Sequence, residues 1–126
     1  MDENQLSQII VDAAIEVHRT LGGPGLLESI YREALAFEIQ SRGVEVEQEK
    51  LVPVKYKSRE LKAPLRLDLL VGKLVIVECK ATELYNSIFE VQTLTYLRLT
   101  GIKLGLVINF GQRLVKHGIH RVVNGL

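Results

Sequence analysis

The sequence predicts an α/β protein in which a mixed β-sheet is flanked by helices. Apolar residues recur at helical spacing in the first third of the chain and alternate with polar residues through the middle. Near the C-terminal end, another helical segment separates two strongly apolar stretches of strand length. The expected order of elements is therefore α-α-β-β-β-β-α-β-(β), and 126 residues are enough for one domain with its own core, residues 1–126.

Two amphipathic helices are expected at the start of the chain. Apolar side chains at helical spacing predict the first from Gln5 to Leu21, and the run Gly22-Gly23-Pro24-Gly25 ends it in a loop. A second helix is expected from about Leu26 to Arg42. Gly43 then stands where a glycine with a left-handed backbone would close the helix.

The period of the apolar pattern changes from that of a helix to that of a strand after Gly43. The segment from Val44 to Glu47 alternates. The segment from Val52 to Lys57 alternates around Pro53, which indicates an edge strand or a break in pairing. Ser58 to Glu60 is typical of a hairpin loop. Two short strands are therefore expected before the strongest part of the pattern.

A helix and one or two strands are expected at the C-terminal end. Ser87 and Glu90 match a capping box, so a third helix should begin there and stop at Gly101. The segment from Leu104 to Phe110 is typical of a fully buried strand that runs parallel to a neighbour after a helical crossover. A last strand is expected within Arg113 to Val123.

The composition excludes several classes of protein. A hydrophobic content of 47% with 25% charged residues is ordinary for a globular protein. The single cysteine excludes an internal disulfide framework and a zinc site made of cysteines, and it fits a reducing cytoplasm. The first residues are acidic and polar, unlike a signal peptide, and no apolar run approaches the ~20 residues of a membrane span. We therefore expect a cytoplasmic protein without membrane association.

The net charge of +1 does not mark a nucleic-acid-binding protein, but the basic residues are unevenly spread. One stretch contains six of them, opposed only by Glu60: Lys50, Lys55, Lys57, Arg59, Lys62 and Arg66. Such a stretch could follow a phosphate backbone. The solvated face of a hairpin would have the same composition, so both interpretations remain open.

Asp68, Glu78 and Lys80 place charges inside two apolar segments of strand character. Side chains alternate along a strand, so Glu78 and Lys80 share one face and Cys79 points to the other, apolar face. Buried charges are costly unless something pairs or uses them. Mg²⁺ and Mn²⁺ bind one or two carboxylates together with water and phosphate oxygens, so Asp68 and Glu78 could hold such an ion. A solvent-exposed pair between Glu78 and Lys80 is the alternative.

The loop between these two segments decides whether the carboxylates share a face. Strands are expected from Leu65 to Val71 and from Leu74 to Lys80. A two-residue turn at Gly72-Lys73 would put the two carboxylates on opposite faces. A three-residue loop that pairs Leu70 with Leu74 would put them on one face, diagonal to each other. A metal site therefore requires a loop of odd length or an equivalent bulge.

Four motifs occur in order along the chain. They are Gly25-Leu26-Leu27-Glu28-Ser29-Ile30-Tyr31, Asp68 with Glu78-Cys79-Lys80, Gln92-Thr93-Leu94-Thr95-Tyr96, and Gly118-Ile119-His120-Arg121. Together they resemble the PD-(D/E)XK nuclease superfamily, and the first reproduces the name-giving motif of its GxxExxY branch. Leu67 stands where the superfamily pattern has a proline, a residue that many members lack.

The resemblance implies a restriction-endonuclease-like fold and hydrolysis of phosphodiester bonds that depends on Mg²⁺ or Mn²⁺. By position, Asp68 and Glu78 would be the metal ligands and Lys80 the catalytic lysine. Glu28 would be a further acidic residue of the catalytic site, near the metal or its bound water. From the residues alone, a surface ion pair with Arg32, four positions later in a helix, explains Glu28 better.

Gln92 and Tyr96 share one face of the third expected helix, near its start. Backbone N–H groups favour anions there, so both residues could contact phosphate or support the catalytic lysine. Helix packing with a polar rim is an equally consistent interpretation. Together with Lys55, Lys57 and Arg66 from the basic stretch, they are the candidate substrate-binding residues.

Besides a self-associating structural protein, two functions remain open on this basis. The first is a metal-dependent nuclease whose partner is nucleic acid, with DNA favoured over RNA. The second is a non-catalytic module on the same fold, which holds nucleic acid or a protein through the basic stretch. Small nucleases that the chain resembles often act as dimers, so a homodimer or a protein partner is compatible with either function.

Overall fold

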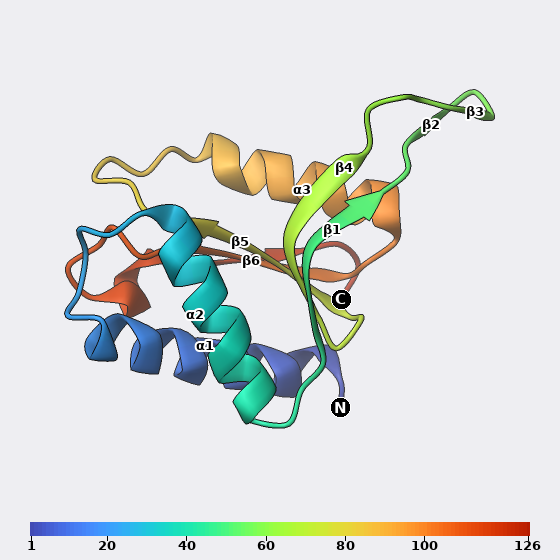
Figure 1. The fold of residues 1–126 in the computed structure, drawn as a ribbon. Helices are drawn as coiled ribbons and strands as arrows, with labels where there is room; N and C mark the ends of the chain where they lie inside the picture. Colours follow the sequence, from blue (N-terminus) through green and yellow to red (C-terminus); the bar gives the residue numbers. More distant parts are fainter.

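A computed structural model describes residues 1–126 and is drawn as a ribbon in Figure 1. Its elements in chain order are α1 (Glu3–Thr20), α2 (Glu28–Ser41), β1 (Val46–Val52), β2 (Lys55–Tyr56), β3 (Arg59–Glu60), β4 (Leu65–Val71), β5 (Val75–Lys80), α3 (Ile88–Thr100), β6 (Leu104–Asn109), the 3₁₀ turn η1 (Val115–Gly118) and β7 (Ile119–Val123). The predicted class, a mixed sheet flanked by helices, is confirmed, and the last strand is present.

The main sheet contains five strands in the order β1-β4-β5-β6-β7. β5 and β6 run parallel, whereas the other neighbouring strands are antiparallel. The parallel pair is possible because α3 carries the chain back across the sheet between the two strands, as predicted. The C-terminal end of β5 therefore lies beside the C-terminal end of β6, and the first half of β4 lies at the same end of the sheet.

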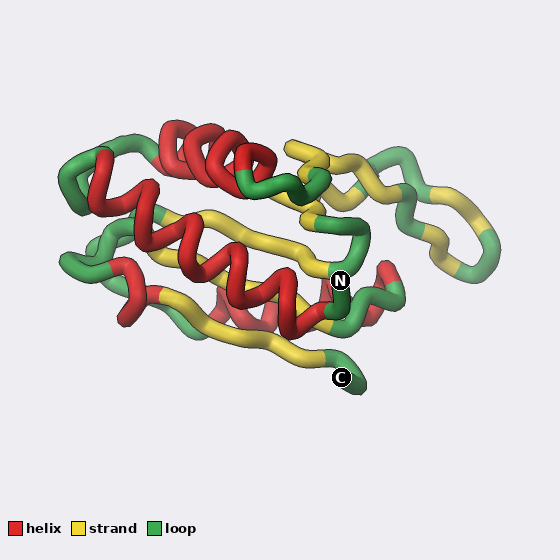
Figure 2. The backbone as a smooth tube through the Cα atoms, turned by 90° about the horizontal axis from the view of Figure 1, so that it is seen from below, coloured by secondary structure: helices red, strands yellow, loops and turns green.

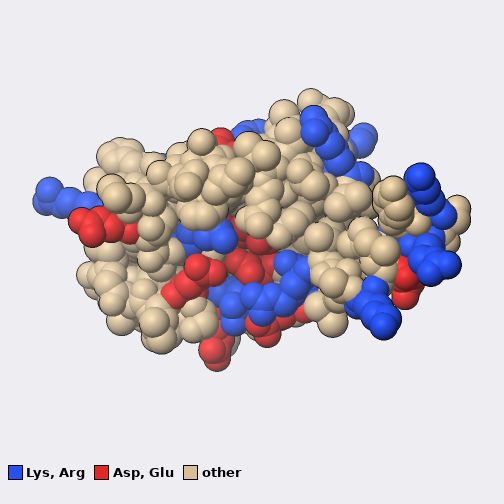
Figure 3. Space-filling model, turned by 90° about the horizontal axis from the view of Figure 1, so that it is seen from above, with Lys and Arg blue, Asp and Glu red and all other residues tan.

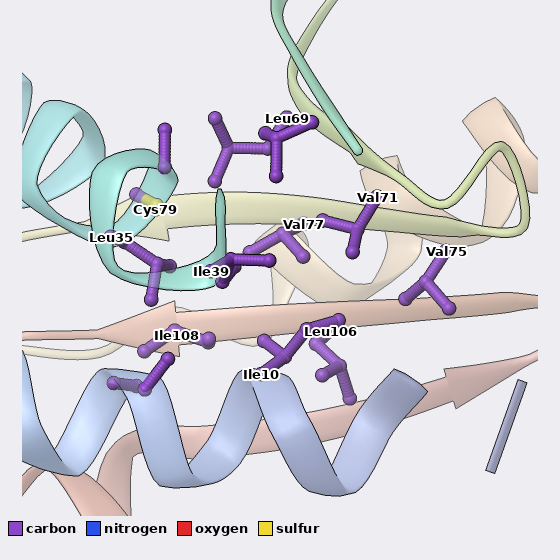
Figure 4. Close-up of a cluster of buried hydrophobic side chains, with 14 of the residues drawn as sticks. Ile10, Leu35, Ile39, Leu69, Val71, Val75, Val77, Cys79, Leu106 and Ile108 are labelled. Carbon is purple, nitrogen blue, oxygen red and sulfur yellow. The ribbon is translucent and has the colours of Figure 1, made fainter. Parts of the chain in front are cut away.

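The two N-terminal helices cover one face of the sheet and α3 covers the other (Figures 1 and 2). On the first face, Ile10 of α1 and Ile39 of α2 lie in one buried cluster with Val77 and Leu106 of the sheet (Figure 4). Cys79 points into this cluster, as the alternation of β5 predicted. Because both faces are covered, β5 and β6 are buried at nearly every position, which explains their continuous apolar sequence.

The ends of the helices agree with the sequence in part. Gly43 and Gly101 both have a left-handed backbone, with φ of +84° and +74°, and follow α2 and α3 as predicted. A capping box that was not predicted is present at the start of α1, where the side chains of Asp2 and Gln5 accept each other's backbone N–H groups. None of the helices combines the length and the apolar content that a membrane span requires.

The predicted capping box at the start of α3 is wrong. Ser87 has a helical backbone and its side chain caps nothing. The side-chain oxygen of Asn86 accepts the N–H of Ile88 instead, at 2.9 Å. Glu90 does not reach back to the helix start, because its carboxylate accepts the hydroxyl of Tyr85 at 3.1 Å. The position of the helix was predicted correctly, but the groups that stabilise its first turn were not.

The strands before β4 differ from the prediction. β1 runs continuously to Val52 and pairs with β4 along its length, so the first expected strand is longer than predicted. The second is interrupted at Pro53 and continues only as β2. β2 and β3 then form a separate two-stranded hairpin, which projects from the body (Figure 1). Its turn is Lys57-Ser58, so the predicted loop was too long at Arg59 and Glu60, which lie in β3. We call residues 53–64 the β2–β3 arm.

Candidate active site

The loop between β4 and β5 has three residues, Gly72 to Leu74. Val71 pairs with Val75, so the predicted odd length is confirmed, while the predicted pairing of Leu70 with Leu74 is wrong, because Leu70 pairs with Ile76. Gly72 and the next residue both have a left-handed backbone, with φ of +57° and +62°. The loop therefore starts one residue later than expected. As a result, each residue of β4 pairs with a residue of β5 two positions further along the chain than expected.

Packing against α1 explains why the turn is at Gly72. A Cβ atom on Gly72 would lie 2.9 Å from a methyl carbon of Leu6, so only glycine fits there without displacing that side chain. Its N–H donates to the carbonyl oxygen of Glu45 at 2.8 Å, which also ties the loop to the chain before β1. The helix and the loop thus fix the register of the hairpin together.

Asp68 and Glu78 lie directly opposite each other when the β4–β5 register is continued. The N–H of Asp68 donates to Oε2 of Glu78 at 3.0 Å, and the N–H of Cys79 donates to Oδ2 of Asp68 at 2.9 Å. Each carboxylate is therefore held by the backbone of the opposite strand. Both residues are buried, with 5% and 7% of their surface exposed. The second oxygen of each carboxylate remains available to another partner.

Burial dominates the electrostatics of this pair. Burial, followed by the neighbouring charge of Asp68, raises the pKa of the Glu78 carboxyl to about 8. The N–H of Asp68 and the ammonium of Lys80 act in the opposite direction but do not offset the burial. Glu78 therefore holds a proton at neutral pH in the free protein.

Lys80 ends β5 on the same sheet face as Glu78. Its ammonium lies 4.7 Å from the centre of the Phe89 ring, on the first turn of α3, in a cation–π contact. It is close enough to lower the pKa of Glu78 and that of Glu28. Phe89 thus holds the ammonium over the site. Sequence reasoning missed this residue, for which the only signal was an aromatic side chain at the start of α3.

Glu28 is the first residue of α2 and lies close to the carboxylate pair. Burial raises its pKa, Asp68 raises it further, and Lys80 lowers it. The predicted ion pair between Glu28 and Arg32 is wrong. Arg32 instead approaches Glu49 of β1 with 3.4 Å between Nη2 and Oε1, and its buried Nε has no partner. Glu28 is therefore free to face the site.

Arg66 lies at the rim of the site. Its guanidinium bonds Glu49 at 2.7 Å and reaches to 3.9 Å from Oδ1 of Asp68. Half of its side-chain surface is exposed, so it can also meet a ligand. Figure 3 looks down on this side of the protein, where acidic and basic side chains gather in the middle of the surface.

Tyr96 lies close enough to the two carboxylates for their charges to act on its hydroxyl. Burial raises the pKa of the Tyr96 hydroxyl, and the nearby charges of Glu78 and Asp68 add to this effect. Gln92 lies one turn earlier on α3, where its side chain is exposed and forms no hydrogen bond within the protein. Lys55 and Lys57 are exposed on the β2–β3 arm, away from the carboxylates.

A cluster next to Phe89 was also missed from the sequence. Tyr85 stacks on His120 of β7 with 4.0 Å between ring centres, and it meets Phe89 edge to face. Glu90 accepts the hydroxyl of Tyr85 and lies 3.8 Å from Nδ1 of His120. His120 pairs with Val107, the neighbour of Glu78 in β6, so the cluster lies on the same row of the sheet as the site.

Asn109, fully buried at the end of β6, positions the chain that follows Lys80. Its side chain accepts the N–H groups of Thr82 and Gly111 and donates to the carbonyl oxygen of Thr82, each at 3.0 Å. These bonds hold the segment after β5 against β6. The direction in which Lys80 leaves the sheet is therefore set by a residue 29 positions later in the chain, with which it pairs.

The residues present fit a divalent cation that is shared with a substrate. The side chains include no group of three or more His, Cys, Asp or Glu placed to hold a metal by themselves. Two carboxylates with one uncommitted oxygen each are nevertheless the usual protein share of a magnesium site, whose other ligands are water and phosphate oxygens. Burial and the charge of Asp68 both disfavour the ionised form of Glu78, and a bound cation would stabilise that form.

Comparison with known proteins adds the family to this geometry. A family model described as the PD-(D/E)XK nuclease superfamily matches residues 4–122. No curated protein and no solved structure matches the chain. The match covers nearly every element, including the β4–β5 hairpin with its paired carboxylates. The protein therefore belongs to the PD-(D/E)XK nuclease superfamily.

Proposed function

We propose that this protein is a metal-dependent nuclease of the GxxExxY branch, which hydrolyses phosphodiester bonds of nucleic acid. The observation that carries the proposal is the pairing of Asp68 and Glu78, buried side by side and held by each other's backbone N–H groups. Membership of the nuclease superfamily supports a nuclease-type function. A purely structural role explains less well why two carboxylates occupy a buried sheet, where burial works against their charged forms.

Asp68 and Glu78 are the residues that would hold Mg²⁺ or Mn²⁺. When bound, such an ion polarises phosphate oxygens and lowers the pKa of a coordinated water. The backbone N–H of Asp68 and that of Cys79 hold the two carboxylates in place, so neither needs to reorient when substrate arrives. A cation bound there would favour the ionised form of Glu78, with its proton released to solvent.

Lys80 and Glu28 assist the attack of water on phosphorus. The Lys80 ammonium stabilises the negative charge that develops on the phosphate oxygens, and Phe89 limits the positions that it can adopt. Glu28, whose pKa is raised, accepts a proton from the attacking water more readily than an exposed glutamate would. Arg66 and the Tyr96 hydroxyl meet the phosphates next to the bond that breaks, and Gln92 and the arm lysines contact the strand further away.

The test is cleavage of a panel of DNA and RNA substrates with Mg²⁺ or Mn²⁺. Asp68→Asn, Glu78→Gln and Lys80→Met should each lower the cleavage rate by at least about 100-fold, because each removes a charge at the reacting phosphate. Glu45→Gln and Lys73→Met remove the same charges at exposed positions and serve as matched controls. Equal rates in all the variants and the wild type would exclude this mechanism.

Calorimetric titration with Mn²⁺ separates the nuclease from a non-catalytic module on the same fold. The nuclease requires binding that disappears in Asp68→Asn and in Glu78→Gln. A module that only holds nucleic acid or a protein has no need of the ion, so heat unchanged by both substitutions would favour it. The titration is done without nucleic acid, so its result does not depend on having found the substrate.

A further inference from the structure

Two prolines separate the β2–β3 arm from the main sheet. The β1–β4 ladder ends with the pair Val52 and Leu65, and the next position in the same register would place Pro53 opposite Pro64. Neither proline has an N–H group, so neither strand can extend the ladder at this point. The arm resumes pairing in a different register, with Lys55 opposite Glu60. It is therefore an independent ribbon and not an extension of the sheet.

The arm is exposed on both faces. It is held by the pairs Lys55 with Glu60 and Tyr56 with Arg59, and by a bond of 2.8 Å from the N–H of Leu61 to the carbonyl oxygen of Val54. Every residue from 55 to 64 is exposed. A two-stranded hairpin without a packed face is marginally stable in water. Its side chains are therefore available to a partner that covers the ribbon.

The charge of the arm indicates a polyanionic partner. Lys55, Lys57, Arg59 and Lys62 face only one acidic residue within the arm, and basic side chains are visible on the projecting part in Figure 3. The ammonium of Lys57 lies 5.5 Å from the ring centre of Tyr56, a residue that is 61% exposed. The tip therefore combines positive charge with a flat aromatic surface, as nucleic-acid contacts do.

The dimensions of the arm distinguish between nucleic-acid duplexes. Two paired strands lie about 4.8 Å apart, and with side chains they fill a groove of about 12 Å, the width of the major groove of B-form DNA. The major groove of A-form RNA is too narrow and deep for a ribbon to enter. Resting on the proposed function, we infer that the arm enters the major groove of a DNA duplex held at the carboxylate site.

The position of the arm relative to the site agrees with this inference. β4 runs directly from the arm to Asp68, and Arg66 lies between them at the rim of the site. The turn Lys57-Ser58 is ten residues from Asp68, so it can lie at most about 35 Å away. That is the length of one turn of B-form DNA. The arm and the site can therefore contact one duplex within a single turn.

The test compares the affinity of the protein for three ligands by fluorescence anisotropy in EDTA, so that no bond is cut. The ligands are a DNA duplex of about two turns, an RNA duplex of the same sequence and a single DNA strand. Wild-type protein should bind the DNA duplex at least about tenfold more tightly than either of the others. Equal affinity for the RNA duplex, or a preference for it, would overturn the inference.

A pair of double variants tests the arm itself. Lys55→Gln with Lys57→Gln should weaken binding to the DNA duplex by about tenfold and reduce the slope of log K against log salt by roughly 2, because two phosphate contacts are lost. Lys73→Gln with Lys103→Gln is the matched control. It also removes two exposed lysines, one of them with a left-handed backbone like Lys57, at the opposite end of the sheet.

Equal losses in the two double variants would show that the arm has no special role and would overturn the inference. This result does not depend on catalysis, because the affinity for DNA is measured in EDTA, where no bond is cut. Cleavage that depends on Asp68 together with unchanged binding by the arm variant would refute the arm and leave the nuclease proposal intact. Absence of cleavage together with selective loss of duplex binding would refute the nuclease and leave the arm's role standing.

Discussion

The carboxyl group of Glu78, with its pKa raised to about 8, shows how much depends on single residues in this site. A carboxylate that could reach water would ionise, but Glu78 is buried next to a second carboxylate, and both effects raise its pKa. Lys80 and Phe89 form the other critical pair, because the ring fixes the position of the ammonium. The first pair leads to a prediction on stability and the second to a prediction on the cleavage rate.

The first prediction concerns the stability of the free protein as a function of pH. Glu78 binds its proton more tightly in the folded state than in the unfolded chain, where its pKa is near 4.5. The free energy of unfolding should therefore fall as the pH rises from about 4.5 to about 8 and then level off. In Glu78→Gln this contribution is absent, so the variant should be more stable than wild type at about pH 8.5, by on the order of 2–4 kcal/mol.

Urea unfolding in EDTA at several pH values measures this difference. Glu45→Gln, at an exposed position, is the matched control and should follow the wild-type profile. Glu28 has a pKa raised in the same direction, so some fall with pH should remain in Glu78→Gln. Parallel profiles for wild type and Glu78→Gln would show that the carboxyl of Glu78 ionises normally in the fold.

The second prediction concerns Phe89. Phe89→Leu keeps an apolar side chain beneath Lys80 but removes the aromatic face, so the ammonium should occupy a wider range of positions. We expect kcat to fall by about 3- to 30-fold with little change in KM, which corresponds to a cation–π contact of about 0.7–2 kcal/mol. Steady-state cleavage kinetics measure it. Phe37→Leu, on an exposed face of α2, should leave kcat unchanged, and an equal loss there would refute the role of Phe89.

At the scale of elements, the β4–β5 hairpin determines whether a site exists. A loop of even length would have placed the two carboxylates on opposite faces of the sheet, whereas the observed loop of three residues aligns them. The loop in turn depends on α1, because Leu6 leaves room only for a glycine at position 72. A helix far from the charged residues thereby constrains the register that brings them together.

The third prediction tests this dependence. Gly72→Ala introduces a Cβ atom both at a left-handed backbone position and 2.9 Å from Leu6, so two penalties add. Gly43→Ala, with φ of +84° and no atom near the new Cβ, has only the first. We expect Gly72→Ala to lose about 2–4 kcal/mol of unfolding free energy and Gly43→Ala about 1 kcal/mol. Equal losses in urea unfolding would mean that the packing of Leu6 does not constrain the loop.

At the scale of the whole molecule, the site draws on several elements. β4 and β5 supply Asp68, Glu78 and Lys80, α2 supplies Glu28, and α3 supplies the ring below the lysine. β6 orients the chain beyond Lys80 through Asn109. Because all these elements must be folded before the carboxylates meet, occupation of the site is coupled to global stability.

The fourth prediction follows from that coupling. Mn²⁺ at about 100 times its Kd should raise the free energy of unfolding of the wild type by about 2.7 kcal/mol relative to EDTA. Asp68→Asn should lose this increase, because one of its two ligands is gone, while Asp12→Asn on α1 should retain it. Thermal and urea unfolding with and without the ion measure the effect. An equal increase in Asp68→Asn would place the ion elsewhere on the protein.

Local patterns in the sequence were enough for most of the fold. The periods of apolar residues located α1, α2, β4, β5 and β6, because each element buries a regular face. Pro53 marked the place where pairing of β1 ends, although the strand before it is longer than predicted. The helix cap at Ser87 was predicted wrongly because Asn86, Ser87 and Glu90 could all compete for the same N–H groups, and the surrounding chain decides between them.

The sequence by itself determined that Asp68 and Glu78 could meet only across a loop of odd length, since side chains alternate along strands whatever surrounds them. It also determined which charges interrupt apolar strands. Only the tertiary structure decided that Arg32 turns to Glu49 instead of Glu28, and that Phe89 lies beside Lys80. These contacts join elements that are distant in the chain, and their geometry depends on how helices pack on the sheet, which local periodicity does not encode.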